Sequence, residues 1–152
     1  MTDTDAPFVP PGFVPPVALD RPDFRLRPLG PEHNASDYAA WTSSVDHIRS
    51  TPGWASEGWP HDMSLEDNRG DLERHAADFA ARRGFTYTVL APDAETVIGC
   101  VYIYPDKLGR DARILSWVRA ADAALDRPLW EAVSSWIASE WPFERVAYDT
   151  RA

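Results

Sequence analysis

The chain of 152 residues has the length of one ordinary domain, and 44% apolar with 26% charged residues are the proportions of a globular protein. Its 24 acidic and 15 basic residues give a formal charge of −9, which repels nucleic-acid backbones and anionic membranes, so neither is expected as a partner. A single cysteine, Cys100, excludes an internal disulfide, and no apolar run is long enough to span a membrane. The sequence therefore predicts a cytoplasmic protein.

Residues 1–22 are predicted to form an extended, Pro-rich arm that precedes a domain of residues 23–152. Six prolines lie between positions 7 and 22 and disfavour both helix and strand. The arm also carries several apolar side chains, which indicate that it lies on a surface of its own domain or of a partner; a frayed terminus is the alternative. These apolar residues are Phe8, Val9, Phe13, Val14 and Val17.

The domain is predicted to open with a strand and an amphipathic helix. Phe24 and Leu26 alternate with arginines before Pro28, which is the period of a half-buried strand with a firm end. Apolar residues then recur three and four positions apart, which predicts a helix that ends near residues 51–53. They are Tyr38, Trp41, Val45 and Ile48.

A second helix is predicted to begin at Ser64. The Ser64 hydroxyl can accept a backbone amide while Asp67, three residues on, reaches back to the first turn. This helix turns an apolar stripe inward and should stop by Gly84. The stripe consists of Leu65, Leu72, Ala76 and Phe79.

The second half is predicted to contain three strands, a helix and a last strand. The turn at residues 91–94 contains Pro92 and predicts that the first two strands pair as a hairpin. Asp126 is predicted to cap the helix, which has Pro128 in its first turn and ends at Trp141. The strands are residues 85–91, 96–104, 114–118 and 145–150.

This order of elements, β-α-α-β-β-β-α-β, resembles the GNAT-type N-acetyltransferase fold over residues 24–150. Three stretches carry the resemblance together, namely residues 24–29, 97–104 and 115–119. The resemblance implies an α/β (α+β) fold with a GNAT-like mixed, mostly antiparallel sheet flanked by helices, preceded by the Pro-rich arm. The family adds a helix and two strands after the last strand found here, so an open sheet edge is expected at residues 145–150. The arm or a second copy of the chain, in a homodimer, would cover that edge.

In the GNAT family, acetyl-CoA lies between the strands that residues 114–118 and 145–150 resemble. Backbone amides of a glycine-rich loop and a helix N-terminus hold its pyrophosphate. The corresponding loop, residues 119–127, has no glycine and carries Asp122 and Asp126, so acetyl-CoA is expected to bind weakly. The cofactor-binding candidates that the resemblance implies are Ser116, Trp117, Val118, Arg119, Asp126 and Arg127.

Four aromatic residues are the candidates for substrate binding. Trp54 and Trp59 lie in the loop of residues 51–62, the region that faces the acceptor in the family. They suit an aromatic wall for an apolar or cationic ligand, or they anchor the loop on the domain. Tyr102 and Tyr104, on the central strand, line a pocket or pack in the core, and the sequence leaves both alternatives open.

No catalytic residue and no metal site are assigned from the sequence. The central strand has no carboxylate to act as a base, and Cys100 has no basic partner at a recognisable spacing. His61 and His75, with the carboxylates near them, lack the spacing of metal ligands. Two hypotheses about function follow. In the first, the chain is an acetyltransferase-like protein that transfers an acyl group from a CoA thioester to an unidentified amine of a small molecule or protein. In the second, it is a non-catalytic GNAT-like module that binds a small ligand or protein in the same cleft.

Overall fold

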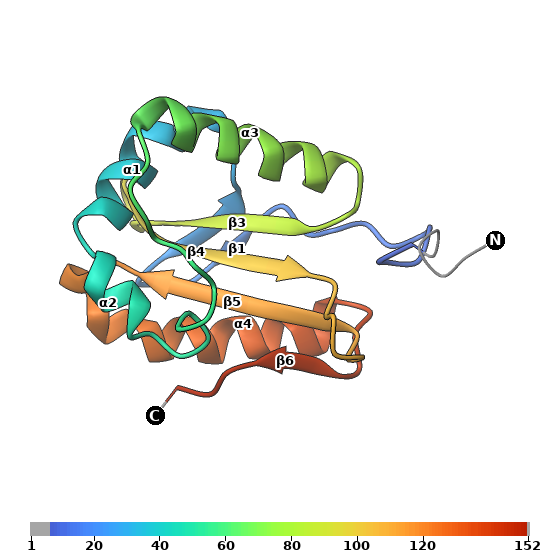
Figure 1. Cartoon of the computed structure of the whole chain (residues 1–152). Coiled ribbons are helices and arrows are strands. Elements are labelled where there is room, and N and C mark those ends of the chain that lie inside the picture. The colour runs from blue at the N-terminus through green and yellow to red at the C-terminus, as the bar shows by residue number, and fades with distance from the viewer. Residues whose placement is uncertain (1–6, 152) are drawn as a thin grey trace.

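The computed structural model describes residues 7–151, and within them six strands form one sheet with helices on both faces (Figure 1). The strands lie in chain order from β1 to β6, and every neighbouring pair is antiparallel except β5 and β6, which are parallel. This confirms the predicted mixed, mostly antiparallel sheet. The strands are β1 (Leu19–Asp20), β2 (Arg25–Pro28), β3 (Phe85–Leu90), β4 (Val97–Tyr104), β5 (Ala112–Val118) and β6 (Val146–Tyr148).

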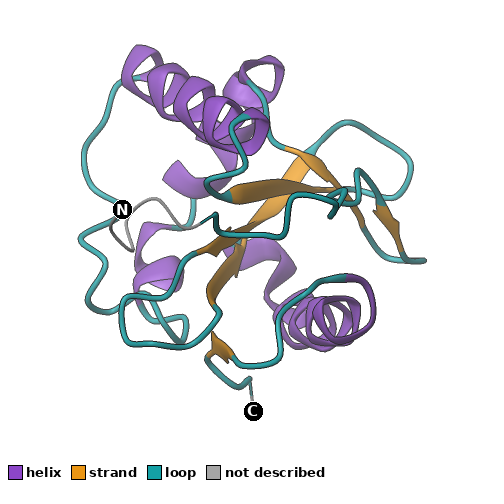
Figure 2. Cartoon of the chain, turned by 90° about the vertical axis from the view of Figure 1, so that its right-hand side faces the viewer, coloured by secondary structure: helices purple, strands orange, loops and turns teal. Residues whose placement is uncertain are grey.

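Three helices cover one face of the sheet and a fourth covers the other, as the turned view shows (Figure 2). Because alternate side chains of a strand point to opposite faces, each face has its own apolar core. Tyr87 and Ile114 face α4, whereas Cys100 and Trp117 face α1, α2 and α3. None of the helices within residues 7–151 is long and apolar enough to cross a membrane. The helices are α1 (Asn34–Thr42), α2 (Val45–Arg49), α3 (Leu65–Ala80) and α4 (Asp126–Glu140), with short 3-10 turns η2 (Pro31–His33) and η3 (Ala120–Leu125).

The predicted first helix is broken in two, so the expectation of a single helix through residues 38–48 was wrong. Ser44 lies between α1 and α2 with non-helical backbone angles, φ −137° and ψ 24°. The Ser43 hydroxyl donates to the Ala40 carbonyl at 2.8 Å, and such side-chain bonds compete with the helical ladder. The break is useful to the fold because the Ser44 hydroxyl accepts the Ala120 amide at 2.8 Å and holds η3 against the helices.

The N-terminal arm lies on its own domain, on the face that α4 covers. Val9 and Leu19 are buried in that core. Two hydrogen bonds hold the arm: the Tyr87 hydroxyl donates to the Pro16 carbonyl at 2.6 Å, and Arg82 donates to the Pro10 carbonyl at 2.7 Å. Residues 1–6 of the predicted arm lie outside the described residues.

The arm does not close the edge at residues 145–150, and that alternative was wrong. Its strand β1 pairs with β2, at the opposite end of the sheet from β6. The reason is the short connection of residues 21–24, which allows the arm to fold back only onto the strand that follows it. Among the described residues no strand lies beyond β6.

Candidate functional site

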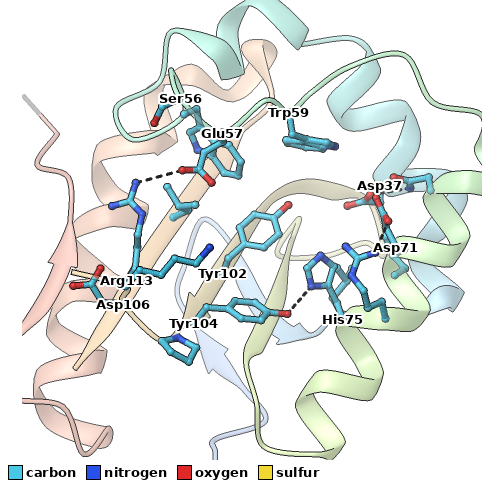
Figure 3. Close-up of a pocket in the computed structure, with 18 of the residues that line it drawn as sticks. Asp37, Ser56, Glu57, Trp59, Asp71, His75, Tyr102, Tyr104, Asp106 and Arg113 are labelled. Atoms are coloured by element: carbon cyan, nitrogen blue, oxygen red, sulfur yellow. Dashed lines mark hydrogen bonds and ion pairs between the residues drawn. The ribbon is translucent and has the colours of Figure 1, made fainter. Parts of the chain in front are cut away.

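A pocket of about 740 Å³ lies on the face of the sheet that α1, α2 and α3 cover (Figure 3). Side chains from α1, α3, β4 and β5 line it, together with the loops of residues 51–62 and 105–111. The fold therefore brings all four predicted substrate-binding residues to one site. They are Trp54, Trp59, Tyr102 and Tyr104.

Trp54 and Trp59 both anchor their loop on the domain and form walls of the pocket, so the two roles that the sequence left open for them are found together. Trp54 is 5% exposed, and its indole nitrogen donates to the Ser116 carbonyl of β5 at 2.9 Å. Its ring lies 5.4 Å from Trp59 and 5.5 Å from Tyr102, measured between centroids. Trp59 also packs on Trp41 at 5.3 Å, so a continuous aromatic surface extends from the loop to α1.

Asp37 lies at the inner end of this pocket and was missed by the sequence analysis. It is only 4% exposed, although it lines the pocket. Asn68 of α3 donates to its Oδ2 at 3.1 Å, which is the one hydrogen bond that the described residues make to this carboxylate. Burial raises the pKa of Asp37 from 3.8 to about 6. The signal in the sequence was its position four residues before Trp41, which places it on the buried side of α1.

His75 stands beside Asp71 on the α3 wall and is the second polar group that the sequence analysis did not assign. Its Nδ1 lies 2.8 Å from the Tyr104 hydroxyl and 3.1 Å from the Thr86 hydroxyl, while the Tyr104 hydroxyl donates to Asp78 at 2.9 Å. Because Tyr104 gives its only proton to Asp78, Nδ1 of His75 is the donor to Tyr104. Burial, followed by the charge of Arg74, lowers the pKa of His75 to about 4, so the ring is neutral at pH 7.

The outer part of the pocket carries charges of both signs, most of them in ion pairs, and Lys107 lines it without an ion pair to any described residue. Arg113 lies 3.7 Å from Glu57 and 3.9 Å from Asp149, and Arg74 forms a 2.6 Å ion pair with Asp71. These pairs are partly exposed and contribute little stability. Within residues 7–151 no three His, Cys, Asp or Glu side chains are grouped so that they could hold a metal ion.

β5 and β6 separate from each other beyond their first three paired positions. The parallel register runs from Ala112 with Val146 to Ile114 with Tyr148, and β5 then continues to Val118 without β6 beside it. This is the divergence that the resemblance leads us to expect. Arg151 fills the gap: it is 4% exposed and donates to the Ser116 carbonyl at 2.9 Å.

The first turn of α4 closes the other side of the gap. Asp126 is not the helix cap, because Leu125 takes that position and Asp126 lies inside the helix. Its carboxylate instead accepts from Nε of Arg151 at 2.8 Å, which explains why this acidic residue faces inward. The hydroxyls of Tyr148 and Ser116 lie 2.6 Å apart beside this ion pair.

The remaining cofactor-binding candidates are engaged elsewhere. Trp117 points to the opposite face, where its indole donates to the Tyr102 hydroxyl at 3.0 Å, and Val118 is buried under α4. Arg119 forms a 2.7 Å ion pair with Asp122, and Arg127 is exposed beside Glu131. Of the six candidates, Ser116 and Asp126 are joined through Arg151, and Asp126 and Arg127 line the same small cavity.

The residues around this gap do not fit a bound diphosphate as they are arranged. A phosphate site needs free backbone amides and a positive helix end. Here the Ala120 amide bonds Ser44, the Asp122 amide bonds the Arg119 carbonyl, and the carboxylate of Asp126 occupies the first turn of α4. The cavity next to it, about 330 Å³, is lined by Pro52, Ala123, Ala124, Asp126, Arg127 and Arg151.

Similar solved structures are acetyltransferases. The ribosomal-protein-S5-alanine acetyltransferase of Vibrio fischeri has 11% sequence identity and a TM-score of 0.66 over 88% of this chain and 73% of that chain. RimL, a ribosomal L7/L12 alpha-N-protein acetyltransferase in complex with coenzyme A, has 12% sequence identity and a TM-score of 0.65 over 88% of this chain and 72% of that chain. A protein from Bordetella pertussis assigned to the GnaT-family acetyltransferases has 15% sequence identity and a TM-score of 0.60 over 88% of this chain and 77% of that chain.

No family model and no curated protein sequence matches the chain, so its likeness to these acetyltransferases lies in the three-dimensional structure. The match extends over most of the chain. The chain has the fold of the GNAT acetyltransferases.

Proposed function

We propose that this chain is an acetyltransferase-like protein that binds a small amine in the aromatic pocket and binds acetyl-CoA only weakly. The observation that carries the proposal is the contrast between two sites. The pocket is open, walled by aromatic rings and holds a buried carboxylate, Asp37, that accepts from Asn68 and forms no ion pair with any described residue. The cofactor gap is closed by the ion pair of Arg151 with Asp126.

Acyl transfer from a CoA thioester to the bound amine is the activity that the divergence of β5 and β6 supports. The gap lies next to the pocket, since Trp54 lines the pocket and also bonds Ser116 in the gap. A complex of RimL with coenzyme A is among the similar structures. Transfer in this chain requires that Arg151 leave the Ser116 carbonyl.

A non-catalytic module that binds a ligand in the same pocket is the second candidate function, and the closed gap favours it. Arg151 bonds the Ser116 carbonyl, the Asp149 carbonyl and the Asp126 carboxylate. A ligand that enters between β5 and β6 would have to replace these bonds, and buried polar groups left without partners are costly. Ligand binding in the pocket requires none of these changes.

We expect acetyl-CoA to bind with a dissociation constant in the high micromolar range or weaker, about 2 to 4 kcal/mol less favourable than a micromolar site. Asp126→Asn should strengthen binding about tenfold, because it removes the carboxylate at the helix N-terminus and frees Arg151 to meet a phosphate. Glu131→Gln is the matched control, since it removes the same charge from an exposed position of α4. Titration calorimetry measures both variants.

An activity assay beside the calorimetry decides between the two candidate functions. Release of free thiol from acetyl-CoA in the presence of a panel of primary amines would establish transfer. Micromolar binding by the unaltered protein would refute the weak-binding prediction. Absence of thiol release at millimolar acetyl-CoA, with amine binding retained, would leave the non-catalytic module.

We also propose that the chain forms a homodimer through the uncovered edge of β6 and functions in the cytoplasm. An unpaired strand edge is a template for pairing, and a second copy would cover it by two-fold symmetry. Light scattering should report twice the mass of the chain, and amides along Val146–Tyr148 should exchange slowly. A monomer with fast exchange at these amides would contradict the dimer.

The division into an arm of residues 1–22 and a domain of residues 23–152 remains our proposal.

A further inference from the structure

We propose that the ligand of the pocket is a primary arylalkylamine, with its ammonium group on Oδ1 of Asp37 and its ring among Trp54, Trp59 and Tyr102. This inference rests on the proposed function, because it names the substrate class of the same site. It goes beyond that proposal by assigning the anchor residue and the shape of the ligand. It also concerns binding alone and holds whether or not transfer occurs.

The first argument is that the buried carboxylate of Asp37 has no cation as a partner among the described residues. Asp37 is 4% exposed, and its described hydrogen bond is the one from Asn68 to Oδ2. The other oxygen, Oδ1, is not among the buried atoms left without a partner, and it belongs to a side chain that lines the pocket (Figure 3). A carboxylate removed from water is costly unless a cation and hydrogen-bond donors meet it. An ammonium group supplies both.

The second argument is that the neighbours of Asp37 do not supply that cation. On α3, Asp71 is acidic and paired with Arg74, and His75 is neutral at pH 7. On β4, the thiol of Cys100 and the phenol of Tyr102 keep their protons, because burial raises the pKa of each. No described basic residue forms an ion pair with Asp37.

The third argument concerns the body of the ligand. Trp54, Trp59 and Tyr102 form a connected surface with centroid distances of 5.4 and 5.5 Å, which suits a flat ring, and faces of such rings also attract a nearby cation. Leu29 and Leu72 make the adjoining wall apolar. A ligand with many charges or hydroxyls would leave its own polar groups unpaired against these walls.

The outer end of the pocket carries charges of both signs. Arg113 faces Glu57 there, and Lys107 lines the same pocket and forms no ion pair with any described residue. Asp37 and the aromatic walls therefore favour a ligand with an ammonium group and an aromatic body.

The probe for the test is 2-phenylethylamine, and 2-phenylethanol is its neutral counterpart of nearly equal shape. Calorimetry or ligand-observed NMR on the full chain without cofactor should show that the amine binds at least about tenfold more tightly than the alcohol at pH 7.5. Asp37→Asn should remove this preference and leave alcohol binding unchanged. Glu73→Gln, which removes an exposed carboxylate of the same helix α3 outside the pocket lining, should keep the preference.

The pH dependence gives a second measurement that does not depend on a variant. The amine stays protonated between pH 5 and 8, whereas Asp37 takes up a proton near pH 6, so amine affinity should fall below that pH and alcohol affinity should not. The N,N,N-trimethyl derivative of the amine lacks an N–H donor and should bind more weakly than the primary amine. Equal binding of amine and alcohol, or an unchanged preference in Asp37→Asn, would overturn the proposal. Failure of thiol release with acetyl-CoA would affect only the proposed transfer.

Discussion

Replacing Asp37 with asparagine should stabilise the free protein at pH 7 by about 2 to 3 kcal/mol, because the shift of its pKa from 3.8 to about 6 measures the cost of its buried charge. Asparagine has nearly the same shape, and its side-chain oxygen can still accept from Asn68. The melting temperature should therefore rise by roughly 5 to 10 °C for a chain of this size. The same variant loses the ammonium anchor, so stability and ligand binding should change in opposite directions.

The sign of this effect follows from proton linkage. The folded state holds the Asp37 proton more tightly than the unfolded state, so wild-type stability falls as pH rises through the interval from about 4 to 6. His75, with its lowered pKa, acts in the opposite sense over part of that range, but it is present in both proteins and cancels in the difference. The gain from Asp37→Asn should be full at pH 7 and vanish below about pH 4.

Denaturant titrations of the wild type and Asp37→Asn at pH 4 and pH 7 measure this difference. Asp71→Asn is the matched control, because its partly exposed carboxylate is paired with Arg74 and its loss should change stability by less than about 1 kcal/mol. A less stable Asp37→Asn protein at pH 7 would show that the carboxylate is held by stronger bonds than the one from Asn68. That result would also remove the argument for an incoming cation.

Deletion of residues 1–22 should cost several kcal/mol and leave a protein that is partly unfolded or associated at 25 °C. The deletion removes Val9 and Leu19 from the core under α4, and each large apolar side chain buried there contributes about 1.5 to 3 kcal/mol. It also takes β1 from the edge of β2 and uncovers Phe85 and Trp141, which pack against arm residues Phe8 and Phe13. Such a loss is comparable with the whole stability of an ordinary domain.

A pair of valines in the arm provides the matched test. Val9 is 2% exposed, whereas Val14 is 81% exposed. Val9→Ala should lower the free energy of unfolding by about 2 kcal/mol, since it leaves a cavity, and Val14→Ala should change it by less than about 0.5 kcal/mol. Circular dichroism during heating measures the melting temperatures of the wild type, the deletion variant and the two valine variants. An unchanged melting temperature after the deletion, with a clean monomer in light scattering, would show that the domain does not need the arm.

Local patterns in the sequence determined those elements that depend on a helix cap or a short turn. The capping box of Ser64 and Asp67 was predicted and is present, with Ser64 accepting the Asp67 amide at 3.0 Å. The hairpin of β3 and β4 was predicted from the turn between them, since a short turn leaves the two strands no other partner. The mixed sheet flanked by helices was predicted from the resemblance of this order of elements to the GNAT fold.

Contacts between residues far apart in the chain were decided by the tertiary structure alone. Asn68 meets Asp37 across 31 positions, and Arg151 meets Ser116 across 35. Neither contact has a local signal, because the spacing of Asp37 to Trp41 indicates its burial but not its partner, and the sequence analysis assigned neither Asp37 nor Arg151.

The sequence by itself determined β3, β4, β5, α3 and α4, because apolar periodicity, caps and turn residues act over a few positions. Their arrangement in one mixed sheet was predicted from the resemblance of their order to the GNAT fold. The sequence also shows that the loop before α4 has no glycine. It also named the aromatic residues of the pocket. Only the tertiary structure decided that these rings surround a buried carboxylate and that Arg151 closes the gap beside β5. Burial and charge pairing depend on which distant segments the fold brings together, and no local pattern contains that information.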